Sequence, residues 1–163
     1  YTKTKHIGIL ATQGTVKSDS YVIEINKFFP DIKVTQEACP IWVPLVENNE
    51  YQTEGGKYFI KKHIDHIFEK DPKIDALVLG CTHYPILLNE LKKFVPSHVT
   101  ILSQGEIVAN QLKYYLQRHT EIEAKCSKDG TSKYFTTEDP ATFKEKAGIF
   151  LKEKIEVEHL DLG

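Results

Sequence analysis

The sequence predicts an α/β fold, with an open parallel sheet and helices on both of its faces. Two short runs, Ile7–Ala11 and Ile74–Leu79, are almost wholly apolar, which is typical of parallel strands that are buried on both faces. Other segments place apolar residues at i, i+4, i+7 and i+8, the spacing of an amphipathic helix. Since strand-type and helix-type segments alternate, the chain is expected to be built of βαβ units.

The remaining elements follow the same two patterns. Further strands are expected at Ile32–Thr35, Val99–Leu102, Tyr134–Thr137 and Ile155–Leu160. Amphipathic helices are expected at Tyr21–Phe29, Ile60–Phe68, Leu87–Val95, Val108–Leu116 and Phe143–Leu151. Proline suits the first turn of a helix, so Pro85 and Pro140 mark two of the helix starts. From residue 5 to about residue 103 the order is β-α-β-loop-α-β-α-β, which predicts an open parallel sheet, and the segment from Gly105 onward has the order α-β-α-β.

The composition sets bounds on the function. The 163 residues carry a formal net charge of -2, which gives no basic surplus for nucleic acid. No apolar run reaches the roughly 18 residues that a membrane span needs. The three scattered cysteines form neither a disulfide framework nor a paired metal motif, so a reduced, cytoplasmic compartment is expected. Methionine is absent and the chain runs almost directly into a strand, so it is expected to begin inside a longer protein.

Polar loops follow two of the expected strands. "ATQGTVKS" (Ala11–Ser18) follows the first strand, and "GCTHYP" (Gly80–Pro85) follows the strand at Ile74–Leu79. Ligands of open parallel sheets bind beyond the carboxyl ends of the strands, where both loops should face one crevice. The side chains expected to share this site are Thr12, Thr15, Cys81, Thr82 and His83.

Cys81 has two interpretations. As a reactive thiol, it would be activated by the helix expected to begin near Pro85, because a helix N-terminus carries partial positive charge, and His83 could exchange a proton with it. Thr82 would then offer a hydroxyl and a backbone N–H to an anionic ligand. As a structural residue, Cys81 would fill a tight strand-to-helix turn, with His83 on the surface. The spacing alone leaves both interpretations open.

Two other stretches also have two interpretations each. "ATQGTVKS" is either a helix start capped by Thr15 or Ser18, or a cradle for a carboxylate or phosphate, and it lacks the GxxxxGK[ST] pattern of a P-loop. "ACPIWVPLVENNEY" (Ala38–Tyr51) contains two prolines, which should prevent a regular helix. It is either a surface loop that packs through Trp42 or an active-site wall that carries the carboxylate of Glu47.

No metal site is expected. His63 and His66 fall mostly toward the polar side of their helix, and no third ligand is nearby, so both are interpreted as part of a solvated face. Cys126 lies in a polar loop and Cys39 precedes a proline, and both are interpreted as incidental.

Several stretches together resemble the glutamate racemases of the cofactor-independent aspartate/glutamate racemase superfamily. "LGCTHYP" (Leu79–Pro85) matches, with high specificity, the signature around the second catalytic cysteine of that family. "IGILATQGTVKSDSY" resembles its threonine-bearing substrate loop, and "ACPIWVPLVENNEY" its Cys-Pro…Pro-Leu-Val-Glu segment. "SQGEIVA" and "YFTTEDPATFKEKAGIFL" resemble its C-terminal portion. The Asp-Ser-Gly loop and the Cys-Asn-Thr motif of the family's N-terminal half do not occur, so the resemblance is to the C-terminal part alone.

The resemblance implies a reaction and a set of roles. Glutamate racemases interconvert L- and D-glutamate with two thiols on opposite sides of the α-carbon, without pyridoxal phosphate or metal, and supply D-glutamate for peptidoglycan. Cys81 would be one acid/base, the one expected to act on L-glutamate, with His83 assisting it and Glu47 in a supporting acid/base or orienting role. The substrate's carboxylates or ammonium group would be bound by Thr12, Thr15 and Thr82.

The resemblance also implies how the chain is organised. Residues 1–103 would form the complete second domain of a racemase, and residues 104–163 would return to the first domain, whose other half is absent. The apolar helix faces of this segment would lack their natural cover, so a homo-oligomer is expected. With one acid/base where two are needed, the isolated chain is expected to be inactive.

Three alternatives stay open beside glutamate racemase. One is an aspartate or other amino-acid racemase of the same superfamily, although the histidine after Cys-Thr and the following Tyr-Pro favour glutamate. Another is a small-molecule binding module without turnover. A third class, an enzyme that uses Cys81 as a nucleophile, would be recognised by a trapped covalent intermediate.

Overall fold

The computed structural model describes residues 1–151 and 153–163. The chain divides into two compact units, Tyr1–Gln111 and Leu112–Gly163. Among the helices of the described residues, none is both long and apolar enough to span a membrane.

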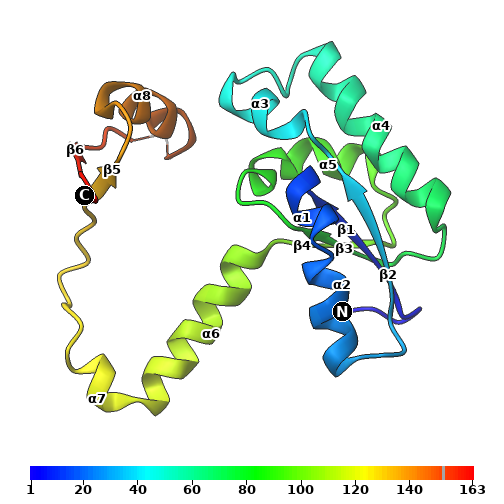
Figure 1. The fold of residues 1–163 in the computed structure, drawn as a ribbon, viewed down its shortest axis with the longest axis horizontal. Coiled ribbons are helices and arrows are strands. Elements are labelled where there is room, and N and C mark those ends of the chain that lie inside the picture. Colours follow the sequence, from blue (N-terminus) through cyan, green and yellow to red (C-terminus); the bar gives the residue numbers. More distant parts are fainter. Residues whose placement is uncertain (152) are drawn as a thin grey trace. The chain divides into compact units, whose positions relative to one another are not determined.

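Four parallel strands form the sheet of the first unit (Figure 1). Their order is β2-β1-β3-β4, so β1 and β3 are the central strands. The strands are β1 (His6–Ala11), β2 (Lys33–Ala38), β3 (Ala76–Leu79) and β4 (Thr100–Leu102). All pairings are parallel, which confirms the predicted fold class.

Helical segments connect each strand to the next. They are α1 (Gln13–Lys17), α2 (Ser20–Phe28), α3 (Trp42–Glu47), α4 (Glu54–Lys70), the 3₁₀ helix η1 (Tyr84–Leu87) and α5 (Leu88–Phe94). In Figure 1, α2 lies on one side of the sheet and α4 on the other. Parallel strands need such crossovers, and their helices cover the sheet from both sides.

The core of this unit lies between the sheet and α4. Gly8 of β1 shows how closely the two layers pack, because a Cβ atom there would lie 2.7 Å from Leu77 Cδ1 and 3.0 Å from Ile67 Cδ1. Ile64 and Ile67 of α4 and Leu77 of β3 are at most 1% exposed. Only glycine at position 8 lets the helix approach the central strand at this distance.

One local prediction is wrong at α3. The two prolines of the Ala38–Tyr51 segment do not prevent a helix, because Trp42–Glu47 is helical. Pro44 lies in the first turn, where the backbone N–H has no acceptor within the helix, so the missing donor costs nothing there. The interpretation that Trp42 packs against the domain is confirmed, since its side chain is fully buried.

A second local prediction is wrong at the start of α1. The cap is Thr12, whose hydroxyl accepts a hydrogen bond from the backbone N–H of Thr15, and neither Thr15 nor Ser18 has that role. Ser18 instead ends α1, and α2 starts after Asp19, which has a left-handed φ of 51°. The loop after β1 therefore turns twice within a few residues.

The second unit contains a smaller α/β arrangement. The long helix α6 (Gln104–Arg118) leads out of the first unit and is followed by α7 (Thr120–Glu123). The strands β5 (Tyr134–Thr136) and β6 (Val157–His159) pair in parallel, with α8 (Pro140–Leu151) between them. The Asp139 carboxylate caps α8 by accepting from the backbone N–H of Thr142 at 2.8 Å, which helps to lower the pKa of Asp139. The predicted strands and helices of this region are confirmed.

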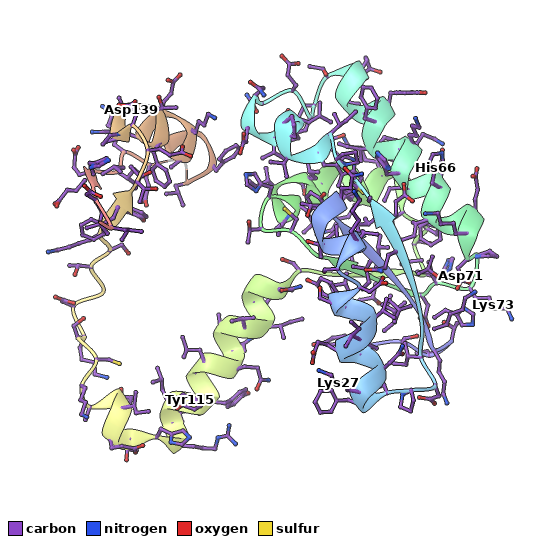
Figure 2. The ribbon with its side chains drawn as sticks, in the orientation of Figure 1. Lys27, His66, Asp71, Lys73, Tyr115 and Asp139 are labelled. Atoms are coloured by element: carbon purple, nitrogen blue, oxygen red, sulfur yellow. The ribbon has the colours of Figure 1, made fainter. Side chains whose placement is uncertain are left out.

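Asp71 makes folding sensitive to acid. It ends α4 (Figure 2), it is 2% exposed, and its carboxylate contacts His6 Nδ1 at 2.7 Å and Lys33 Nζ at 3.0 Å. Burial alone would raise the pKa of Asp71, but the hydrogen bonds from His6 and Lys33 outweigh it and lower the pKa from 3.8 to about 2. The resulting stability is complete above the unfolded-state pKa and is lost as the pH falls through the folded-state pKa.

We therefore expect an Asp71→Asn variant to lose part of the acid dependence of folding. Between pH 4 and pH 2, its free energy of unfolding should fall by about 2 kcal/mol less than that of the wild type. Urea denaturation at a series of pH values measures this difference. Asp65→Asn, which removes only the surface partner of Lys61, serves as the control and should keep the wild-type slope. Equal slopes for Asp71→Asn and the wild type would show that the ion pair does not control acid unfolding.

Candidate functional site

Three loops meet at the carboxyl edge of the sheet. Leu10 of β1 pairs with Leu79 of β3, and Ala11 of β1 pairs with Ala38 of β2, so the residues that follow these strands start side by side. The backbone N–H of Cys39 donates to Ala11 O, and that of Gly80 donates to Leu10 O, both at 2.8 Å. The strand register thus brings the Thr12, Cys39 and Cys81 loops to one edge, where open parallel sheets bind ligands.

A thiol, an imidazole and a carboxylate form a chain of contacts at this edge. Cys81 Sγ lies 4.0 Å from His83 Nδ1, and His83 Nε2 lies 3.3 Å from Glu47 Oε1. Both the His83 and the Glu47 side chains are partly exposed, at 33% and 40%, and Cys81 is half-buried. A carboxylate that orients an imidazole, which in turn faces a thiol, is an arrangement suited to proton transfer at a ligand held over Cys81. Glu47 reaches this position because α3 packs beside the η1 turn.

The turn after Cys81 differs from the expected helix start. The backbone N–H of Tyr84 donates to Cys81 O, and that of Ile86 donates to His83 O, each at 3.1 Å, which gives the 3₁₀ helix η1. The α-helix begins only at Leu88. The helical stretch therefore starts near Pro85 but in the 3₁₀ form, and the activation of Cys81 by its N-terminus stays a prediction. The contact with His83 remains as its local polar interaction.

A buried layer supports the Cys81 loop from below. The Tyr84 hydroxyl donates to Cys39 O at 3.0 Å, and the Trp42 and Tyr84 rings meet edge to face with centroids 5.0 Å apart. Burial raises the pKa of Tyr84 and also that of Cys39, which the Glu37 charge raises further. Cys39 therefore remains a neutral thiol that packs in the core and is unsuited to exchange protons with a ligand.

The three threonines are placed differently from one another. Thr12 and Thr15 lie together, with their hydroxyl oxygens 3.0 Å apart at the start of α1. Thr82 lies on the Cys81 loop and is exposed. The structure thus brings Thr12 and Thr15 together on one loop and Cys81, His83 and Glu47 together on the neighbouring ones.

A second polar cluster was missed at the sequence level. His63 is buried, and its Nδ1–H donates to Glu37 Oε1 at 2.6 Å, while His66 Nδ1 lies 3.6 Å from the same oxygen. Burial alone would raise the pKa of Glu37, but hydrogen bonds from Lys70 and His63 outweigh it and lower that pKa. The prediction of a solvated histidine face without a third ligand is wrong, because β2 passes beneath α4 and supplies Glu37. The i, i+3 spacing of the histidines was a visible signal, but their carboxylate partner depends on the sheet order.

Comparison with known proteins finds glutamate racemases. The chain is 34% identical over 161 residues to the glutamate racemase of Streptococcus uberis, with 99% of this chain and 60% of the relative covered. A glutamate racemase isoform of Bacillus anthracis superposes with a TM-score of 0.86 and 34% identity, with 99% of this chain and 59% of that chain covered. The Francisella tularensis glutamate racemase in complex with D-glutamate gives a TM-score of 0.84 at 25% identity, over 97% of this chain and 58% of that one.

No family model matches the chain. The relatives nevertheless match this chain in both sequence and structure, and the chain spans about three-fifths of their length. Similarity at this level over 99% of the chain includes the loops at the carboxyl edge of the sheet as well as the fold. The chain is therefore a homologue of the glutamate racemases, over about 60% of their length.

Proposed function

We propose that this chain forms part of a glutamate racemase and supplies one of the two acid/base thiols that interconvert L- and D-glutamate. The contact chain from Cys81 through His83 to Glu47 is the observation that carries the proposal. The similarity to glutamate racemases supports it, and the Francisella tularensis relative binds D-glutamate in its structure. The product, D-glutamate, would serve peptidoglycan synthesis in the cytoplasm.

The proposed mechanism assigns a step to each side chain. The Cys81 thiolate takes the α-proton of glutamate, and a second thiol on the opposite face returns a proton, so that the configuration inverts without a cofactor. His83 accepts or returns a proton at Cys81 Sγ, and Glu47 holds the His83 ring in position. Thr12, Thr15 and Thr82 bind the substrate's charged groups through their hydroxyls. Because the α-proton is very weakly acidic, the site must also be closed and electrostatically arranged.

The second thiol is the part that the first unit does not supply. The cysteines of the first unit are Cys39 and Cys81, and Cys39 is fully buried with a raised pKa. We propose that the opposing thiol belongs to the other racemase domain, to which residues 104–163 would also belong. The domain division and the expected self-association of the isolated chain stay predictions.

Proton exchange with solvent tests this proposal directly. We expect the purified 163-residue chain, incubated in deuterium oxide with L- or D-glutamate, to give no inverted product. Chiral chromatography measures inversion, and mass spectrometry measures deuterium at the α-carbon. Full racemisation by this chain alone would refute the proposed division of the two thiols. Glutamate binding without any deuterium exchange, in a protein that also contains the complete other racemase domain, would instead identify a binding module.

A further inference from the structure

A cluster of three metal-ligand side chains lies on the first unit, between α4 and β2. Glu37 stands near the end of β2, and His63 and His66 lie one turn apart on α4, where Figure 2 shows His66. Each of the three side chains offers one ligand atom, and these atoms all lie within 4.8 Å of one another. None of these residues belongs to the Cys81 site.

The spacing of the donor atoms suits a single ion. Two ligands bound tetrahedrally at about 2.0–2.1 Å from zinc are separated by roughly 3.3 Å. His66 Nδ1 lies 3.6 Å from Glu37 Oε1, which is long for a hydrogen bond but close to this ligand separation. His63 Nδ1 lies nearer, at 2.6 Å, because its N–H donates to the carboxylate, and metal binding would replace that proton.

The surroundings hold these ligands in place. Lys70 Nζ donates to the other carboxylate oxygen, Glu37 Oε2, at 2.6 Å, which leaves Oε1 directed at the two imidazoles. A hydrogen-bonded outer oxygen of this kind orients a carboxylate ligand. The His63 ring meets the edge of Trp42 at a centroid distance of 6.0 Å and that of His66 at 6.1 Å. Glu37 is 6% exposed and His63 is 9% exposed, so both are fixed by packing before an ion arrives.

A structural role alone leaves His66 unexplained. Lys70 and His63 already give each oxygen of the buried Glu37 carboxylate a hydrogen-bond donor, as a buried charge requires. A second imidazole, directed at the same oxygen from a partly exposed position, is not needed for that purpose. Its exposure of 43% instead leaves a side from which an ion and its water can enter.

We propose that Glu37, His63 and His66 bind a divalent transition-metal cation, with zinc as the best fit. Two imidazole nitrogens and one carboxylate oxygen are a donor set that zinc accepts, and water would occupy the fourth position. Hard cations such as magnesium prefer oxygen ligands and would bind poorly. The site is independent of the proposed racemase activity.

Calorimetric titration of the chelator-treated chain with zinc chloride tests the site. We expect one site per chain, and we expect His66→Gln to weaken its affinity at least about 10–100-fold, the loss typical of removing even an outer partner of a metal ligand. His66 is partly exposed, so this variant should fold, which circular dichroism checks. His98→Gln, at an exposed histidine outside the cluster, is the matched control and should keep the affinity.

Cobalt chloride distinguishes the cluster from the cysteines. A Glu-His-His site gives visible cobalt bands without the near-ultraviolet charge-transfer band of a cobalt–thiolate bond. No zinc binding, unchanged affinity in His66→Gln, or a thiolate band at the first equivalent of cobalt would each overturn the proposal. Loss of binding in His66→Gln, together with retention in His98→Gln and a spectrum free of the thiolate band, would support it.

Discussion

Replacing Cys81 by serine in the full-length racemase to which we propose this chain belongs is expected to lower the turnover number about 10²–10⁴-fold, the range that a positioned acid/base contributes. A hydroxyl is far less acidic than a thiol, so serine at this position cannot supply the anion that takes the α-proton. The Michaelis constant for glutamate should change little, because the threonines, and not the thiol, are proposed to bind the substrate. A chiral assay of both reaction directions measures both constants.

Cys126→Ser is the matched control for this experiment. Cys126 is an exposed thiol in the second unit, and its replacement should leave both kinetic constants unchanged. A Cys81→Ser variant with wild-type turnover would remove Cys81 from the mechanism. A covalent adduct of substrate on Cys81, found by intact-protein mass spectrometry, would also contradict proton transfer, because it would identify a nucleophile.

Replacing Trp42 by alanine is expected to lower the free energy of unfolding by about 3–5 kcal/mol, the range for deleting a large buried aromatic side chain. Trp42 is 0% exposed, and its ring packs against both Tyr84 and His63. Its indole Nε1–H also donates to Phe59 O at 3.4 Å, so the variant loses a hydrogen bond as well as packing. Trp42 is the single tryptophan of the sequence, so urea unfolding must be followed by circular dichroism and not by indole fluorescence.

The neighbouring residue provides the control. Ile41 is 37% exposed, and Ile41→Ala should cost clearly less, because less apolar surface returns to water. A loss below about 1 kcal/mol in Trp42→Ala would mean that α3 is not anchored through this ring. Trp42 also packs against Tyr84, which lies in the turn after Cys81. The same variant is therefore expected to disturb the proposed site.

Local pattern was enough to predict most of the elements. The apolar run Ile7–Ala11 is typical of a buried strand, and the apolar stripe of Ile60–Phe68 indicated the face of α4 that meets the sheet. Both signals depend on residues close together in the chain, where side-chain periodicity follows the backbone directly. The same locality explains the error at α3, because a proline rule that ignores the position of Pro44 within the first turn predicts no helix.

The sequence by itself determined the alternating α/β elements, the two loops at strand ends and the resemblance of "LGCTHYP" to a racemase signature. Only the tertiary structure decided which distant side chains meet. Glu47 reaches His83 because α3 packs on the turn after β3, and Glu37 reaches His63 because β2 is an edge strand beside α4. Contacts of this kind depend on sheet order and helix packing, which arise from the burial of apolar surface over the whole unit and leave no local pattern in the residues that they join.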